Sequence, residues 1–196
     1  MYKDFSERYY SIIDEYVDFH ENGSEKLTGE ETFLGSSLIR WVFHINNIIK
    51  ETKSASLIDF GCGKAMGYLN KITADDVLYQ NVQEFWKIDD VYLYDPGVKK
   101  YSEYPQKKAD GIICTDVIEH IPPEDIYKFI EGLYKLANKF VFVVAATIPA
   151  EKTFKNGENV HLTIKSDDEW LEIFRGFARK NPGIRTFLEF NSNEDE

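Results

Sequence analysis

Cysteine is scarce in this chain of 196 residues, which contains only Cys62 and Cys114. Two cysteines cannot build the disulfide framework of a small secreted scaffold. Each of them lies at the end of a segment that we expect to form a strand. The sequence therefore predicts two small buried thiols in a reducing compartment.

Long apolar runs are missing as well. No stretch approaches the ~20 consecutive apolar residues that cross a membrane. The N-terminal segment Met1–Asp4 does not lead into the apolar region of a signal peptide. We expect a cytoplasmic protein without a membrane partner.

Basic residues are few, because 23 Lys and Arg stand against 34 Asp and Glu, for a net charge of −11. A nucleic-acid-binding surface needs clustered Lys and Arg. Together with an aromatic content of 15%, this charge favours a small molecule or a peptide as the partner of the protein, and disfavours nucleic acid. The segment Glu189–Glu196 carries four acids and no base, and we expect it to fray in solvent.

Hydrophobic residues make up 43% of the sequence, which suits one globular domain of this length. Apolar residues recur near a period of 3.6 over residues 4–19 and from about 32 to 51, which predicts two N-terminal helices. We divide the chain into a helical segment, 1–53, that belongs to the same domain as the core, 54–190, and an acidic tail, 191–196.

The sequence is organised around a glycine-rich turn at Gly61 and Gly63. The turn follows a strand-like run, 56–61, and precedes a segment, 64–72, that we expect to be a helix. Glycine permits a sharp turn and a close approach of the backbone to a ligand, so the pattern predicts a nucleotide or nucleoside pocket. A pyrophosphate turn is poorly matched, because Met66 stands where its third glycine would be.

A second strand-like run, 91–95, ends at Asp95 and is followed by Pro96 and Gly97. A carboxylate at the end of such a strand can accept both hydroxyl protons of a ribose. The alternative is an acid that only ends the strand before a turn.

Two segments carry a resemblance to a known family. Leu57–Gly63 resembles motif I of the class I S-adenosylmethionine (SAM) methyltransferases, with Ala65 in place of the usual third glycine. Asp116–Ile121, Asp-Val-Ile-Glu-His-Ile, resembles motif IV of the same enzymes. The chain also resembles a group of bacterial and viral methyltransferase-like proteins with Phe-His-Glu-Asn-Gly near the start, here Phe19–Gly23, and Asn-x-His-Leu-Thr later, here Asn159–Thr163.

The resemblance implies an α/β fold, a Rossmann-like, mostly parallel sheet with helices on both faces and an N-terminal helical lid. Only 14 residues separate Asp95 from Asp110, so we expect the third strand to be reduced or absent. Tyr16, Arg40 and Trp41 would be able to reach a substrate from such a lid, and simple packing is the alternative for them.

The resemblance also implies SAM as the cofactor and S-adenosylhomocysteine (SAH) as its product. The cofactor-binding residues that it implies are Asp59, Gly61, Cys62, Gly63, Asp95, Pro96, Thr115 and Asp116.

The chemistry at the methyl end has three interpretations. In the first, His120 or His161 is a general base, since a neutral imidazole near pH 7 suits that task. In the second, Asp116, Glu119, His120 and His161 bind a divalent metal, Mg or Mn, as in the metal-dependent O-methyltransferases that this arrangement resembles. In the third, Glu119 and His120 only cap the following helix and brace the pocket.

The other two histidines, His20 and His44, lack such a context, and we expect them on the surface or in the core. Two further classes of function stay open. One is a SAM-binding regulatory or accessory protein without turnover, and the other is a nicotinamide-dependent oxidoreductase, which would need a pyrophosphate turn.

Overall fold

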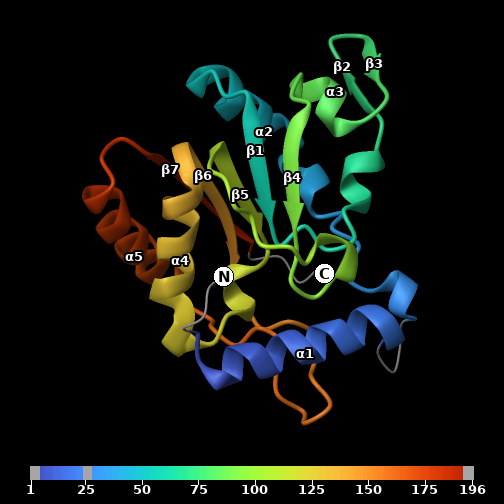
Figure 1. The fold of residues 1–196 in the computed structure, drawn as a ribbon, viewed down its shortest axis with the longest axis vertical. Helices are drawn as coiled ribbons and strands as arrows, with labels where there is room; N and C mark the ends of the chain where they lie inside the picture. The colour runs from blue at the N-terminus through green and yellow to red at the C-terminus, as the bar shows by residue number, and fades with distance from the viewer. Residues whose placement is uncertain (1–4, 24–27, 192–196) are drawn as a thin grey trace.

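Five parallel strands form the centre of the computed structural model, which describes residues 5–23 and 28–191 (Figure 1). The last five residues of the predicted acidic tail, 192–196, lie outside the described residues. The sheet has the order β4-β1-β5-β6-β7, and all of its pairings are parallel. The five strands are β1 (Ser56–Phe60), β4 (Asp90–Tyr94), β5 (Ala109–Thr115), β6 (Ala137–Ala146) and β7 (Arg185–Asn191).

The direction of strand addition reverses beside β1. The chain first adds β4 on one side of β1 and then returns to add β5 on the other. In open α/β sheets, ligands bind in the crevice outside the carboxyl ends of the strands at such a switch point. Among the described residues, β4 is the edge of the sheet, and the stretch between β4 and β5 holds only a short 3-10 turn, Lys99–Tyr101. The expectation of a reduced or absent third strand is therefore confirmed.

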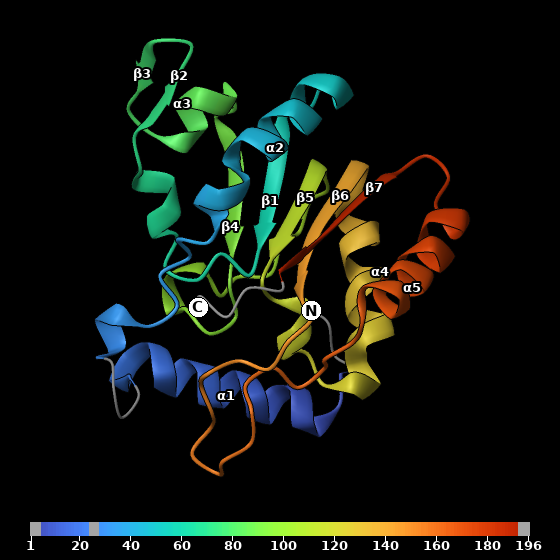
Figure 2. The same cartoon turned by 180° about the vertical axis from the view of Figure 1, so that it is seen from behind.

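Helices cover both faces of the sheet, as a buried parallel sheet requires. One face packs against α2 (Leu38–Thr52) and the short α3 (Val82–Trp86), and Figure 2 shows α2 in front of β1. The other face packs against α4 (Ile126–Leu136) and α5 (Asp167–Lys180). The predicted Rossmann-like architecture is confirmed. None of the helices in the described part of the chain is long and apolar enough to cross a membrane.

The first helix, α1 (Glu7–Asn22), lies across the carboxyl ends of the strands instead of on a face of the sheet (Figures 1 and 2). It begins at the N-cap Ser6, whose backbone N–H and hydroxyl both donate to the Asp125 carboxylate before α4. Near its other end, Asp18 forms an ion pair with Lys155. Of the two N-terminal helices, α1 occupies the position expected of a lid, whereas α2 belongs to the core.

The helix predicted for residues 64–72 is wrong. Ala65 adopts a left-handed backbone with φ +56°, and only a 3-10 turn, Met66–Leu69, follows it. The chain then forms a small antiparallel hairpin, β2 (Ile72–Ala74) and β3 (Val77–Tyr79). The reason is local, since β-branched residues in these two runs favour strands and two left-handed aspartates form the turn between them.

The second predicted helix begins later than expected, at Leu38. Residues 28–37 form a loop instead, with a 3-10 turn at Gly29–Glu31 and left-handed backbones at Phe33 and Gly35 that interrupt any helix. This loop lies against the glycine-rich turn, because Phe33 O accepts from Lys64 N–H and Leu34 O accepts from Met66 N–H.

Candidate functional site

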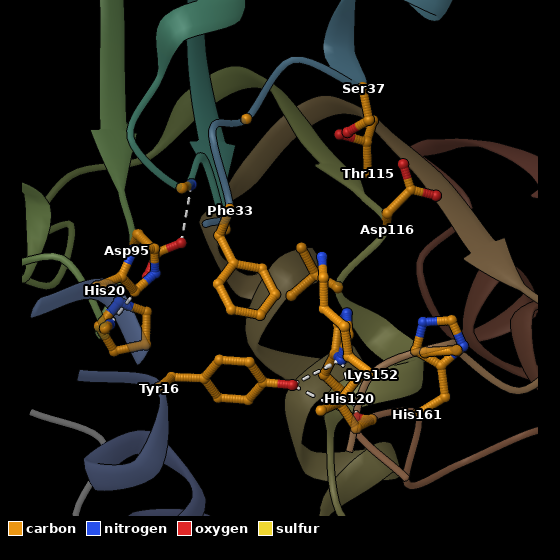
Figure 3. Close-up of a pocket in the computed structure, with 18 of the residues that line it drawn as sticks. Tyr16, His20, Phe33, Ser37, Asp95, Thr115, Asp116, His120, Lys152 and His161 are labelled. Atoms are coloured by element: carbon orange, nitrogen blue, oxygen red, sulfur yellow. Dashed lines mark hydrogen bonds between the residues drawn. The ribbon is translucent and has the colours of Figure 1, made fainter. Parts of the chain in front are cut away.

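A cavity of about 460 Å³ lies between α1 and the carboxyl ends of β1, β4 and β5. Its other walls come from the loop before α2 and from the loop between β6 and α5 (Figure 3). This volume falls in the range of small-molecule sites, roughly 300–1,000 Å³. The cavity occupies the crevice that the strand order predicts for a ligand.

The glycine-rich turn forms one wall, and both of its glycines have positive φ. A Cβ on Gly61 would come within 2.3 Å of the Val117 side chain, and one on Gly63 within 2.4 Å of Phe33 O. Only glycine therefore fits at these positions.

The backbone N–H groups of this turn donate hydrogen bonds to other groups of the protein. Those of Gly61 and Cys62 donate to Tyr94 O, that of Ala65 donates to Cys62 O, and the loop before α2 accepts those of Lys64 and Met66. A pyrophosphate site works through N–H groups that point at the ligand. The turn is thus built to approach a ligand closely, and not to hold a phosphate.

Asp95 joins two loops at the cavity. Its carboxylate accepts from Gly63 N–H at 2.8 Å and from Gly97 N–H at 2.8 Å. Burial raises the pKa of this carboxyl, and the two N–H bonds act in the opposite direction. A carboxylate offers about four lone-pair positions, so two bonds leave capacity for the hydroxyl groups of a ligand.

Two of the predicted cofactor residues lie behind the turn and do not line the cavity. The Asp59 carboxylate is 3% exposed and accepts from the Tyr68 hydroxyl at 2.9 Å, and burial raises its pKa to about 7. Cys62 is a buried free thiol, and so is Cys114, as the sequence predicts. The other predicted cofactor residues line the cavity: Gly61, Gly63, Asp95, Pro96, Thr115 and Asp116.

Asp116 follows β5 directly and has a left-handed backbone with φ +55°. This conformation is uncommon for a residue other than glycine and concentrates at functional sites. Its backbone N–H donates to Val144 O, and its carboxylate accepts from the Asn191 side chain at 3.4 Å. These two hydrogen bonds hold Asp116 in the cavity wall beside Thr115 (Figure 3).

His120 lies beneath α1, and its Nδ1 is 2.9 Å from Val160 O and 2.7 Å from the Tyr16 hydroxyl. A carbonyl oxygen only accepts, so Nδ1 carries the proton and Nε2 carries the lone pair. Burial, and then the neighbouring His161, lower the pKa of His120 to about 3. The ring is neutral at pH 7 and a weak base.

His161 stands beside His120, with a distance of 4.9 Å between the ring centroids. Its Nδ1 is 2.7 Å from Ile148 O, so this ring also has its proton on Nδ1 and its lone pair on Nε2. Burial lowers the pKa of His161, whereas the bond to Ile148 and the charge of Asp116 raise it. Because of these opposing effects, His161 is the better proton acceptor of the pair.

Glu119, His120 and His161 place one potential metal-ligand atom each within 4.8 Å of one another. Asp116, the fourth residue of the predicted metal set, lies outside this group but lines the same cavity. Glu119 is fully buried, and its Oε1 accepts from Ala146 N–H at the end of β6 at 3.2 Å. Glu119 therefore braces the end of β6.

Several residues that line the cavity follow no pattern in the sequence that predicts a site. His20 lies beside Asp95 in the cavity wall, and not in a separate surface or core position (Figure 3). His20 belongs to the Phe-His-Glu-Asn-Gly segment that carries part of the family resemblance, but the resemblance implies no role for this histidine. Phe33, Ser37 and Lys152 also line the cavity, on loops without a recognisable pattern.

The expected lid residues divide between the site and the core. Tyr16 and Arg40 line the cavity, whereas Trp41 packs against Phe142 on the sheet, with 6.0 Å between the ring centroids. His44 is half-buried and lies 3.6 Å from Glu189, away from the lining residues. The Tyr16 hydroxyl contacts His120, so this side chain forms part of the wall.

The charge of the cavity wall is mixed, with acids in excess. The acidic lining residues are Glu31, Asp95, Asp116 and Glu151, and the Lys and Arg lining residues are Arg40 and Lys152. The excess of acids favours a cationic ligand over the wall as a whole, whereas Lys152 places a positive charge at the histidine end of the cavity (Figure 3).

No protein-family model matches the chain, and no curated protein sequence matches it. Among solved structures, the chain is similar to one described as the DhpI-SAH complex, with a TM-score of 0.51. The two chains are 13% identical, and the likeness covers 85% of this chain and 87% of the other. The chain therefore shares the Rossmann-like fold of a protein that has been solved with SAH.

Proposed function

We propose that the chain is a class I SAM-dependent methyltransferase that acts on a small-molecule or peptide acceptor. The observation that carries the proposal is the carboxylate of Asp95, tied to the Gly63 N–H at the switch point of the sheet, inside a cavity of ligand size. The two sequence motifs and the fold shared with a SAH complex support the same conclusion.

In the proposed complex the ribose hydroxyls donate to Asp95. The methionine part follows the turn at Gly61 and Gly63, and Thr115 and Asp116 flank it. Asp59 and Cys62 support this turn from behind. At pH 7 SAM carries a sulfonium and an ammonium against one carboxylate, so the excess of acids in the wall suits it. A nicotinamide dinucleotide is an anion, and the turn has its N–H groups already bonded.

The proposed reaction is an in-line displacement at the methyl carbon. A lone pair of the acceptor forms the new bond to carbon, the carbon–sulfur bond breaks, and its electron pair stays on sulfur to give SAH. The proton of the acceptor passes to Nε2 of His161. We assign this role to His161 and not to His120, because a base whose pKa is about 3 accepts a proton poorly near pH 7. The chain otherwise positions the two reactants.

Metal-assisted O-methylation is a second candidate, favoured by the grouping of Glu119, His120 and His161. Two neutral imidazoles and one carboxylate suit Mn²⁺ or a similar transition metal better than Mg²⁺, which prefers oxygen ligands. A bound ion would act as a Lewis acid towards an acceptor hydroxyl. The Nδ1–H bonds of both histidines would hold the rings in the tautomer that ligation by Nε2 needs.

Calorimetric titration with SAM, SAH and NAD tests the proposal. We expect micromolar binding of both sulfur ligands and none of NAD. Binding of NAD without SAH would refute it. Binding of SAM without methyl transfer to any acceptor, together with an unchanged biological function in His161→Ala, would favour the accessory-protein alternative.

A further inference from the structure

Lys152 places a positive charge at the histidine end of the cavity. The residue lies on the loop between β6 and α5, and Figure 3 shows its side chain beside His120. Its charge also lowers the pKa of both His120 and His161, which agrees with this position. A cation beside the reacting groups needs an explanation, because the proposed cofactor is itself positively charged there.

The position of Lys152 is fixed by its surroundings. Val160 N–H donates to Lys152 O. The side-chain amide of Asn159 accepts from Ala150 N–H and donates to Ala150 O, which closes the base of the loop. The Lys152 ammonium lies over the ring of Phe33, 4.9 Å from its centroid. This cation–π contact holds the ammonium at the face of the Phe33 ring. The N–H donors of the ammonium can still bind an anion.

The neighbourhood of Lys152 does not suit the cofactor. The ribose site at Asp95 lies on the other side of Phe33 (Figure 3), and a sulfonium close to an ammonium is repelled. Ile12, Ile121 and Val160 give the wall near the histidines its apolar surface, and Asp116 acts on His161 from the end of β5. This part of the cavity therefore matches a molecule with an apolar body and one negative charge.

We infer that Lys152 binds a carboxylate of the methyl acceptor, so that the acceptor is a small apolar or aromatic acid; this inference rests on the proposed function. A single lysine offers one positive charge, which matches one carboxylate, whereas a phosphate would call for a cluster or a bidentate Arg. The contact would orient the acceptor with its nucleophile towards His161.

The test compares 4-hydroxybenzoate with its neutral isostere 4-hydroxybenzamide by calorimetry, on the full chain with and without SAH. Lys152→Met removes the charge and keeps an unbranched side chain. Lys152→Arg keeps the charge, and Lys155→Met is the matched control, because Lys155 is 78% exposed and pairs with Asp18 outside the cavity. Thermal unfolding of each variant checks that it folds.

We expect the wild type, Lys152→Arg and Lys155→Met to bind the acid about tenfold more tightly than the amide, and Lys152→Met to lose this preference. SAH binding should be equal in all four proteins. A missing preference in the wild type, no binding of the acid at millimolar concentration, or a preference that survives in Lys152→Met would each overturn the inference. Failure of the wild type to bind SAH would instead refute the proposed function, and the titrations without SAH would still decide whether Lys152 binds the acid.

Discussion

The carboxylate of Asp95, at the end of β4, accepts a hydrogen bond of 2.8 Å from the backbone N–H of Gly63, in the turn after β1. The two residues are 32 positions apart in the sequence and come from neighbouring strands of the sheet. This bond fixes the glycine-rich turn against the loop after β4, and it sets the shape of the crevice in which we place SAM.

The first prediction concerns this contact. Asp95→Asn should weaken SAH binding about tenfold to a hundredfold, because the variant loses a charged acceptor for the ribose hydroxyls, and a hydrogen bond to a charged group contributes about 1.5–3 kcal/mol. Calorimetric titration measures the loss. The matched control is Asp110→Asn, since Asp110 also accepts a backbone N–H, from Ala55 at 2.8 Å, but lies at the opposite end of β5. Equal affinity in the two variants would contradict the role of Asp95.

The second prediction concerns metal binding. Mn²⁺ should bind the wild type more tightly than Mg²⁺, because the group holds two imidazoles and one carboxylate. His161→Ala should weaken Mn²⁺ binding by about tenfold or more. His44→Ala, which alters a histidine outside the cavity, should leave it unchanged. The measurement is titration calorimetry at pH 7, and identical Mn²⁺ affinity in the wild type and His161→Ala would exclude this site.

The third prediction concerns the pH dependence of stability. Burial raises the folded-state pKa of Asp59 to about 7. Between pH ~4 and ~7 the Asp59 carboxyl therefore binds more protons in the folded state than in the unfolded state. The stability that this group contributes falls as the pH rises through this range. His120 and His20 act in the opposite direction below pH ~6.5, because burial lowers their pKa values to about 3 and about 4. Only a comparison with a variant isolates Asp59.

Asp59→Asn keeps an oxygen that can accept from Tyr68 and removes the titration. The free energy of unfolding of this variant minus that of the wild type should therefore rise from pH 5 to pH 8, by about 1–3 kcal/mol. Urea titrations at the two pH values measure the free energy of unfolding of the variant and of the wild type. A difference that stays constant would show that Asp59 does not have the raised pKa.

The fourth prediction concerns α1. Tyr16→Phe removes the hydroxyl that joins α1 to His120, and should reduce stability by about 0.5–1.5 kcal/mol. Tyr134→Phe is the control, since it removes another partly buried hydroxyl that contacts Thr186 away from the cavity. Both variants should lose similar stability, but only Tyr16→Phe should weaken SAH binding, by about threefold to tenfold, because α1 closes the cavity. Equal SAH affinity in the two variants would contradict the role of α1 as a cover.

The sequence predicts most of the sheet because its strands carry strong signals. Buried parallel strands read as near-continuous hydrophobic runs, and β5 and β6 have this pattern, whereas β1 is a shorter apolar run that Asp59 interrupts. The helix expected after the glycine-rich turn fails for a local reason, since the left-handed Ala65 and the strand-forming residues of the following hairpin outweigh a weak helical pattern.

The site is predicted in part, because some of its residues follow strands and others do not. Asp95 and Asp116 end strands, so their positions follow from the fold. Phe33 and Lys152 lie on loops whose shapes depend on tertiary hydrogen bonds, such as that from Lys64 N–H to Phe33 O. Such bonds leave no periodic pattern in the sequence from which they could be predicted. The burial that makes His120 so weak a base is also a property of the packed structure.

The most direct test of the central claim is a crystal structure of the chain grown with SAH. We predict SAH in the cavity beneath α1, with both ribose hydroxyls within hydrogen-bond distance of the Asp95 carboxylate and the sulfur directed towards His161. SAH bound elsewhere, or a ribose that makes no contact with Asp95, would contradict the account.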